Sequence, residues 1–280
     1  MRPFNFNTEK LIAIAIEEDI GTGDITTNSI IPSDATLTGQ FIAREEGMVC
    51  GLGVVKRIFE IIDPLVEFTP KIQDGMHVVP QQVLADICGP ARAILTGERV
   101  SLNFLQHLSG IATKTARIIE SVSGTGIRIL DTRKTIPGLR WLEKYAVRTG
   151  GGLNHRMNLS DGIMIKNNHI KAAGSITLAM EQARLNAPPT LKIEVEVESM
   201  EQVQEAINAG ADIIMLDNMD LVTMRQAVKK INGRALIEAS GNMINKNLSD
   251  VAKTGVDMIS IGGLTHSVKA LDISLRISQQ

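Results

Sequence analysis

From Ile127 onward, the chain repeats a short apolar run that is followed by polar residues and a helical stretch. The six runs are IRIL, GIMI, LKIEVEV, DIIML, ALIEA and DMISI. Alternation of β and α segments is typical of parallel strands covered by helices, so the pattern predicts an α/β fold. Its repeated single-period layout favours a barrel over an open sheet, although the pattern alone leaves both architectures open.

The part of the chain before Ile127 has a different rhythm and predicts a smaller α+β unit. We expect a helix from Asn7 to Asp19, with Asn7 or Thr8 as its N-cap and Gly21 beyond its end. Short strands of an antiparallel sheet are expected in TLTGQFIA, MVCGLGVV, LVEFTP and QQVLADI. After Pro90, apolar residues at three- and four-residue spacing predict one or two long helices within residues 91–124.

The C-terminal tail alternates between apolar and polar residues, which is the pattern of a half-buried strand. The apolar positions are Leu271, Ile273, Leu275 and Ile277. Such a strand can rejoin the N-terminal sheet. We therefore predict an N-terminal domain over residues 1–110, to which residues 267–280 return, and a barrel domain over residues 111–266.

Composition excludes several classes of protein. With 280 residues, of which 44% are hydrophobic, the chain can bury a full core. Its two cysteines, Cys50 and Cys88, have no CxxC spacing and support neither a disulfide framework nor a structural zinc site. No apolar stretch approaches the length of a membrane span, and the N-terminus lacks a signal-peptide pattern. We expect a soluble, cytoplasmic protein.

Positive charge is concentrated in one segment of this slightly acidic chain. Between Arg128 and Lys171 there are nine Lys or Arg against three acids, a local charge of +6, whereas the whole chain carries −2. A nucleic-acid binder would need a broad basic face, which is not present. The concentration indicates a pocket for a small polyanionic ligand.

Polar residues follow the predicted strands, where the C-terminal ends of barrel strands place functional groups. They are Asp131, Thr132, Arg133, Lys134 and Thr135 after IRIL, Lys166, Asn167, Asn168 and His169 after GIMI, Glu194 and Glu196 in IEVEV, Asp217 and Asn218 after DIIML, Ser240, Gly241 and Asn242 after LIEA, and Ile261, Gly262 and Gly263 at the end of DMISI. Six strand ends are thus expected to form one rim.

The cations suit carboxylates and phosphates, because guanidinium offers a planar fork of donors and ammonium a compact charge. Arg140, Lys144 and Arg148 are spaced four apart, and surface charge on a helix is the simpler interpretation for them. Lys166 ends an apolar strand and is either a buried charge or a pocket lysine; both need a nearby anion. His155 is open to two interpretations, a structural residue or a ligand contact beside Arg156.

Glu194, Glu196 and Glu198 alternate with valines and so share one face of a strand. This acidic face, with Asp217, meets either the cation cluster in salt bridges or a ligand's hydroxyl groups and a divalent ion. Mg²⁺ is the usual ion where phosphates supply the other oxygens. The glycine loops at Ser240–Asn242 and Ile261–Gly263 either cradle a phosphate with backbone amides or merely turn the chain. No GxxxxGK[ST], HExxH or GxSxG motif occurs.

Several long motifs in the same order resemble the quinolinate phosphoribosyltransferase family nearly end to end. They are EEDIGTGDITT, GERVSLNFLQHLSGIAT, DTRKTIPGLR, EKYAV, GGGLNHRMNLSDGIMIKNNH, EVEVES, LDN, ASGN and THSV. The resemblance implies an N-terminal α/β sandwich completed by the end of the chain, followed by an incomplete parallel α/β barrel. It implies that quinolinate and phosphoribosyl pyrophosphate, with Mg²⁺, give nicotinate mononucleotide, pyrophosphate and CO₂ in NAD biosynthesis.

The resemblance also implies roles for individual residues. Arg133, His155, Arg156 and Lys166 match the family's dicarboxylate pocket, and Thr132 lies within the same DTRK motif. Lys134 matches the lysine at the reacting centre, Glu196 and Asp217 the acids near ribose and metal, and the two glycine loops the phosphate sites. Arg99 matches an arginine donated by a neighbouring subunit of a homo-oligomer, a dimer or a hexamer; alone, it would read as a helix-face ion pair.

Two rival functions are weighed against this one. A phosphoribosyltransferase for a monocarboxylate such as nicotinate predicts fewer cationic residues around the base. The chain has all five that the family uses there, namely Arg99, Arg133, His155, Arg156 and Lys166. A non-catalytic sensor of phosphate metabolites predicts the loss of Glu196, Asp217 or Lys134, and the chain retains each of them. Both observations favour a quinolinate-specific enzyme.

Overall fold

The computed structural model describes residues 6–278, which form two compact units, each made of separate stretches of the chain. Within these residues, the first unit comprises 6–117, 135–151 and 264–278, and the second comprises 118–134 and 152–263. The division places the segment 135–151, which the sequence pattern assigned to the barrel domain, with the N-terminal unit.

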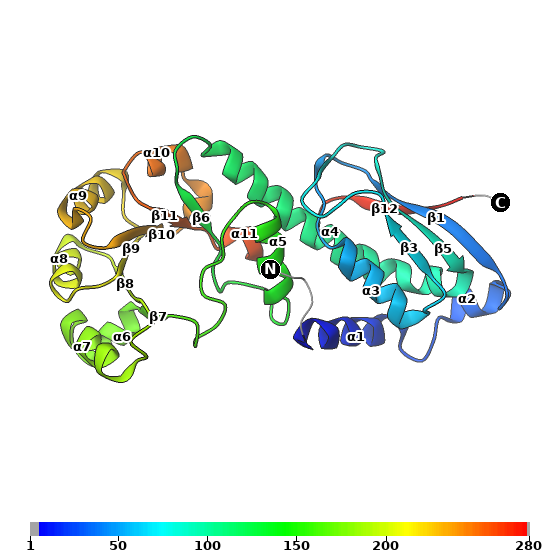
Figure 1. Cartoon of the computed structure of the whole chain (residues 1–280), viewed down its shortest axis with the longest axis horizontal. Helices are drawn as coiled ribbons and strands as arrows, with labels where there is room; N and C mark the ends of the chain where they lie inside the picture. The colour runs from blue at the N-terminus through cyan, green and yellow to red at the C-terminus, as the bar shows by residue number, and fades with distance from the viewer. Residues whose placement is uncertain (1–5, 279–280) are drawn as a thin grey trace. The chain divides into compact units, whose positions relative to one another are not determined.

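The first unit is an α/β unit built on an antiparallel sheet (Figure 1). Its helices are α1 (Phe6–Ile20), α2 (Ile25–Ile30), α3 (Leu52–Ile62), α4 (Ala91–Ser121, whose last residues belong to the second unit) and α5 (Arg140–Thr149). Its strands are β1 (Thr36–Ala43), β2 (Gly47–Met48), β3 (Glu67–Pro70), β4 (His77–Val78), β5 (Val83–Pro90) and β12 (Ile273–Ile277). The short helix α11 (Gly263–His266) begins at the junction between the units.

The end of the chain completes the N-terminal sheet, as its alternating pattern predicts. The strand order is β12-β1-β5-β3, and β12 runs antiparallel to β1 with Gly39 opposite Ile277 and Ala43 opposite Ile273. The Gln106 side chain of α4 also donates to the carbonyl oxygen of Ile273 at 2.7 Å. The tail is therefore a structural strand of this unit.

The core of the first unit lies between its sheet and the helices α3 and α4. Phe41 of the sheet contacts Phe59 of α3 and Phe68 of β3 in edge-to-face geometry, with ring centroids 6.3 and 5.5 Å apart. The helices come close at Gly97, because a Cβ there would lie 2.7 Å from the ring of Phe59. This glycine is required by close packing.

Three expectations for the first unit are resolved by the structure. The segment MVCGLGVV was predicted as a strand, but only its first residue, Met48, belongs to a strand (β2), and a helix follows from Leu52. Gly51, with φ of 112°, lets the chain turn into α3, and the apolar run instead covers the buried face of that helix. Helix α1 already includes Asn7 and Thr8, so neither is its N-cap. A single helix, α4, spans most of the segment after Pro90.

The second unit is an incomplete parallel barrel. Its strands are β6 (Arg128–Leu130), β7 (Ile163–Ile165), β8 (Ile193–Val197), β9 (Ile213–Asp217), β10 (Leu236–Ser240) and β11 (Met258–Ser260). All neighbouring pairs are parallel, in the order β6-β11-β10-β9-β8-β7. Within residues 6–278, β6 and β7 are the two edges of this sheet and do not pair. All six predicted strands are confirmed.

Helices connect these strands in the order that the sequence pattern predicts. They are α6 (Asn167–Ala173), α7 (Ile176–Asn186), α8 (Met200–Asn208), α9 (Leu221–Ile231), the 3₁₀ turn η1 (Met243–Asn245) and α10 (Leu248–Ala252). Ser175, Ser199 and Asp220 cap the helices that follow them, each accepting from a backbone N–H of the first turn. Strands β8 and β9 therefore each end in a short loop before a capped helix.

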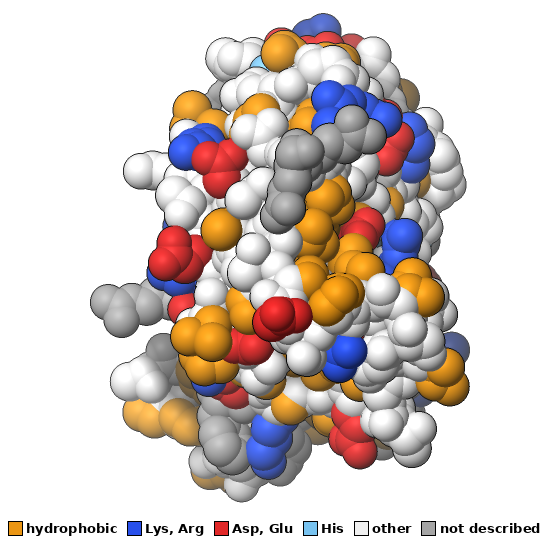
Figure 2. Space-filling model, turned by 90° about the vertical axis from the view of Figure 1, so that its right-hand side faces the viewer, with side chains coloured by type: hydrophobic (Ala, Val, Ile, Leu, Met, Phe, Trp, Pro, Cys, Tyr) orange, Lys and Arg blue, Asp and Glu red, His pale blue; other side chains and the backbone are white. Residues whose placement is uncertain are grey.

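Among residues 6–278, no helix combines the length and apolar character that a membrane crossing requires. Figure 2 shows one face of the molecule, where hydrophobic side chains gather near the centre between charged ones. Large exposed hydrophobic residues of the first unit include Ile25, Ile30 and Leu65, which are 80%, 70% and 72% exposed.

Candidate active site

The residues predicted to form a rim come from the C-terminal ends of the strands of the second unit. Thr132, Arg133 and Lys134 follow β6, and Lys166 follows β7. Glu196 belongs to β8, Asp217 and Ser240 end β9 and β10, and Ile261 follows β11. Because the strands are parallel and adjacent, these ends lie along one edge of the sheet. The expected rim is present.

Arg133 and Arg156 are two half-buried guanidinium groups of this unit whose charges repel each other. Burial lowers the pKa of Arg156 first and the positive charge of Arg133 lowers it further, while Glu194 acts in the opposite direction. The buried Nε of Arg133 has no acceptor among the described residues, whereas Nη1 of Arg156 donates to the carbonyl oxygen of Gly162 at 3.0 Å. An anion between the two groups would satisfy both.

Lys166 is exposed at the strand end, which excludes the buried charge that the sequence left open. Its side chain is 48% exposed, and its Nζ lies 3.8 Å from Oε2 of Glu196. Its backbone N–H donates to Nδ1 of His169 at 2.9 Å at the start of α6. The helix start therefore holds the lysine at the strand end, with a carboxylate as its nearest charge partner.

Glu196 and Asp217 bring carboxylates together on neighbouring strands. The pKa of Glu196 is raised, first by burial and then by the negative charges of Asp217 and Glu198, against the lowering effect of Lys166. Carboxylate oxygens that repel each other at a partly open rim form a donor set suited to a hard divalent cation such as Mg²⁺. Glu196 and Asp217 therefore fit such an ion.

The loop after β10 requires a glycine at position 241. Gly241 has φ of 88°, and a Cβ there would lie 2.4 Å from Oδ1 and 2.6 Å from the backbone N of Asn218. Asn218 follows β9 and donates its backbone N–H to the carbonyl oxygen of Ser240 at 3.1 Å. Ser260 of β11 donates to the Ser240 hydroxyl at 3.0 Å. Neighbouring strand ends thus approach each other closely.

The remaining residues of the two glycine loops lie beside this contact. Asn242 has φ of 51° and begins the 3₁₀ turn, so the chain reverses directly after Gly241. The backbone N–H of Ile261 donates to the carbonyl oxygen of Leu130 at 2.9 Å, which fixes the start of the second loop. Gly262 and Gly263 follow at the end of this unit. Both loops follow strands of the rim.

The sequence placed Asp131 at the end of the first strand without a role of its own, and the structure shows that it anchors the loop that carries His155 and Arg156. It is fully buried, and its Oδ2 accepts from Nδ2 of Asn154 at 2.6 Å. Its Oδ1 accepts from the backbone N–H of His155 at 2.9 Å. An acid directly after an apolar strand, as the first residue of DTRK, was the available signal.

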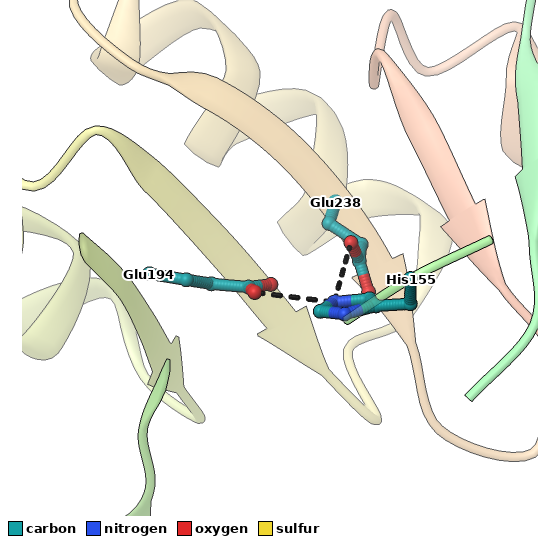
Figure 3. A group of neighbouring side chains, drawn as sticks. All are labelled: His155, Glu194 and Glu238. Atoms are coloured by element: carbon teal, nitrogen blue, oxygen red, sulfur yellow. Dashed lines mark ion pairs between the residues drawn. The ribbon is translucent and has the colours of Figure 1, made fainter. Parts of the chain in front are cut away.

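His155 lies between two buried glutamates, one predicted to be near the site and one missed (Figure 3). Its Nε2 is 3.2 Å from Oε2 of Glu194 on β8 and 3.6 Å from Oε2 of Glu238 on β10. Burial, and then the negative charge of Glu194, raise the pKa of Glu238 to about 7. A glutamate in the apolar run ALIEA, spaced two residues from Ser240, was the available signal.

Two groups of predicted residues belong to the first unit. Arg99 is an exposed residue of α4. In α5, Arg148 is exposed and Arg140 is half-buried, whereas Lys144 is fully buried. The interpretation as surface charge is therefore wrong for Lys144. Helix α5 packs against α4, and Glu143 of α5 accepts a hydrogen bond from Nε2 of His107 of α4 at 2.9 Å.

Comparisons with known proteins agree across the whole chain. Residues 24–109 match the N-terminal domain and residues 111–276 the C-terminal domain of the quinolinate phosphoribosyl transferase models. A probable nicotinate-nucleotide pyrophosphorylase (carboxylating) of Bacillus subtilis is 47% identical over 96% of this chain and 93% of its own length.

Solved structures give the same picture. NadC from Streptococcus pyogenes superimposes with a TM-score of 0.92 at 44% identity, covering 99% of this chain and 98% of its own. The nicotinate-nucleotide pyrophosphorylase from Francisella tularensis superimposes with a TM-score of 0.92 at 40% identity, covering 97% of this chain and 96% of its own.

Proposed function

The chain belongs to the quinolinate phosphoribosyltransferase family, and we propose that it transfers phosphoribosyl from phosphoribosyl pyrophosphate to quinolinate. The products are nicotinate mononucleotide, pyrophosphate and CO₂, in NAD biosynthesis. The protein is thus a carboxylating nicotinate-nucleotide pyrophosphorylase, a glycosyltransferase of the pentosyltransferase class.

The observation that carries this proposal is the pair of guanidinium groups in the second unit. Arg133 has a buried donor without an acceptor among the described residues, and its charge opposes that of Arg156. Two buried like charges are costly unless an anion neutralises them. A planar aromatic dicarboxylate offers one carboxylate for each guanidinium, and Lys166 adds a third cation, whereas a monocarboxylate would leave one arginine unpaired.

A direct assay tests the proposal. The protein is incubated with quinolinate, phosphoribosyl pyrophosphate and Mg²⁺, and nicotinate mononucleotide and CO₂ are followed. We expect stoichiometric formation of both products. Turnover of nicotinate without turnover of quinolinate would overturn the proposal and favour a monocarboxylate enzyme, and no turnover of either base would favour a binding protein.

The residues of the rim have separate roles in the proposed reaction. The ammonium of Lys134, exposed after β6, stabilises the negative charge that develops on the departing pyrophosphate as the bond to the ribose carbon breaks. Glu196 or Asp217 stabilises the positive charge on that carbon. The pyridine nitrogen then forms the new bond. The cationic ring stabilises the electron pair left at the adjacent carbon when CO₂ departs, and that carbon takes up a proton.

Mg²⁺ is the cofactor we propose, and Glu196 and Asp217 would hold it together with the substrate phosphates. The raised pKa of Glu196 supports this assignment, since a cation beside it would relieve the repulsion from Asp217. When bound, Mg²⁺ supplies positive charge that neutralises the pyrophosphate oxygens. The Ser240–Asn242 and Ile261–Gly263 loops bind the phosphate oxygens, and the Ile261 amide, which donates to Leu130, fixes the start of the second loop.

We further propose that the enzyme works as a homo-oligomer, a dimer or a hexamer, in which Arg99 reaches the site of a neighbouring subunit. Arg99 is exposed on α4, so its guanidinium is accessible to a partner. The exposed hydrophobic residues Ile25, Ile30 and Leu65 and the apolar area in Figure 2 favour association, since such surface is usually covered. The cytoplasm is the proposed location, consistent with two free cysteines.

A further inference from the structure

The pair of buried carboxyl groups beneath His155 has no role in the reaction as described above. Glu194 and Glu238 are 4% and 1% exposed. Each has one carboxyl oxygen, Oε1, that is buried without a hydrogen-bond partner among the described residues. Two acids in this state, 3.2 and 3.6 Å from one imidazole nitrogen, need either a cation or a proton.

The hydrogen bonds of His155 favour the proton. Nδ1 of His155 accepts the backbone N–H of Arg156 at 2.7 Å, so Nδ1 carries no hydrogen. A neutral ring therefore carries its hydrogen on Nε2, which points at Glu194 and Glu238 (Figure 3). A metal ion in this group would need the lone pair of Nε2. The ring would then present an N–H to the N–H of Arg156, which is unfavourable.

Glu238 is the better carrier of that proton. Glu194 lies nearer to the imidazole donor, at 3.2 Å, and also interacts with the charge of Arg156. Glu238 lies farther away, at 3.6 Å, and is the more buried of the two. The groups that face Glu238 are the Glu194 carboxylate of β8, the imidazole of His155 and the hydroxyl of Ser260 on β11. Burial and Glu194 favour the neutral acid; His155 and Ser260 favour the anion.

A cavity of about 390 Å³ gives a proton a route from water to Glu238. It is lined by Glu194, Glu238 and His155 and by Ile163, Ile213 and Met258, which begin β7, β9 and β11. The charged side chains of Arg156, Asp161 and Lys192 also line it. The cavity therefore reaches from His155 and Arg156 of the proposed dicarboxylate pocket to the first residues of β7, β9 and β11.

We propose that Glu238 is a positioning residue that takes up a proton when the dicarboxylate binds. In the substrate-free enzyme, the buried carboxyl pair provides negative charge near His155 and Arg156. A bound dicarboxylate brings its own negative charge to Arg156 and makes a second charged glutamate less favourable. The proton moves from water through the cavity to an oxygen of Glu238, and its O–H then satisfies the pair. The inference rests on the proposed function, since it names quinolinate as the ligand.

Calorimetric titration of the full-length enzyme with quinolinate tests the proposal. Binding heats are measured at pH 7.5 in buffers of different ionisation enthalpy, whose slope gives the protons taken up. If binding raises the pKa of Glu238 by one unit from about 7, the uptake is about half a proton per site. Glu238→Gln should bind quinolinate with an uptake near zero, whereas Glu201→Gln, on the exposed surface of α8, should behave as the wild type.

A wild-type measurement keeps the test valid if the variant does not fold. Uptake should fall at pH 5.5, where Glu238 is already protonated. Binding heats independent of the buffer at pH 7.5 would overturn the inference while leaving the proposed function intact; absence of any quinolinate binding would count against the function itself. Stabilisation of the wild type, and not of Glu238→Gln, by Zn²⁺ or Mn²⁺ alone would also overturn it, because the trio would then be a metal site.

Discussion

The ammonium group of Lys166 lies 3.8 Å from the carboxylate of Glu196, between the cationic and the acidic parts of the rim. The lysine comes from the end of β7 and the glutamate from β8, which are paired neighbours in the sheet. Their interaction lowers the pKa of Glu196, against burial, Asp217 and Glu198, which together raise it. The pair therefore links the binding of quinolinate by Lys166 to the charge state of Glu196.

Replacement of Lys166 by Met should shift the pH dependence of catalysis. The pKa of Glu196 already lies above its ordinary value of 4.5, and loss of the cation raises it further. Because the reaction needs the carboxylate, activity is lost as pH falls through this pKa. The acidic limb of kcat/KM, which reports the free enzyme, should therefore move to higher pH in the variant. The control is Lys171→Met, which changes an exposed lysine of α6. If the acidic limb of kcat/KM does not move in the Lys166 variant, Lys166 does not influence the pKa of Glu196.

Replacement of Lys134 by Ala should reduce turnover without unfolding the protein. The side chain is exposed, so little packing is lost, whereas the charge that stabilises the departing pyrophosphate disappears. By analogy with the loss of a single charge-stabilising donor, kcat should fall by about 10²- to 10³-fold. Steady-state kinetics and thermal unfolding measure the two effects. Lys171→Ala serves as the control, and near-normal turnover would remove Lys134 from the mechanism.

Much of this architecture could be predicted because each strand carries its own signal. The six apolar runs of the barrel were identified from periodicity, and Glu194 and Glu196 were placed on one face because side chains alternate in strands. The tail was assigned to the N-terminal sheet for the same reason. The prediction of MVCGLGVV as a strand was wrong, because a short apolar run does not distinguish a strand from the buried face of a helix.

The site was less predictable where it depends on residues far apart in the sequence. Lys144 is buried because α5 packs within the first unit, which spacing along one helix does not reveal. Glu238 joins Glu194 and His155 through the order of the sheet, in which β9 separates β8 from β10. A pair of acids in two apolar strands predicts a polar interior, but the partner of each acid follows only from the register.

Replacement of Glu238 by Gln should change how stability depends on pH. The pKa of Glu238 in the folded protein, about 7, lies above its ordinary value of 4.5, so folding favours the protonated acid. This stabilisation is present at low pH and is lost as pH rises from about 4.5 through about 7. Gln cannot ionise. The Tm of the variant relative to the wild type should therefore increase between pH 5 and 8, and a constant difference would contradict the assignment.

Replacement of Gly241 by Ala should destabilise the phosphate loop. The new Cβ would collide with the backbone of Asn218, and φ of 88° is unfavourable for alanine. Gly233 is a matched control, since it has φ of 73° and open space around it. Gly233→Ala should cost about 1–2 kcal/mol of unfolding free energy from the backbone alone. Gly241→Ala should cost more in urea unfolding and raise the KM for phosphoribosyl pyrophosphate; equal costs would argue against the steric contact.

Replacement of Arg99 by Ala should yield an enzyme that a second inactive variant can partly rescue. If Arg99 serves the site of a neighbouring subunit, mixed oligomers of Arg99→Ala and Lys134→Ala contain one site with an intact Lys134 and an Arg99 from the partner. Each variant alone lacks one group at every site. Activity should therefore appear on mixing after subunit exchange. In a randomly mixed dimer half of the dimers are mixed and each has one intact site of two, so the activity per site should approach a quarter of the wild-type value. Failure to recover activity, despite exchange shown by mass spectrometry, would place Arg99 outside a shared site.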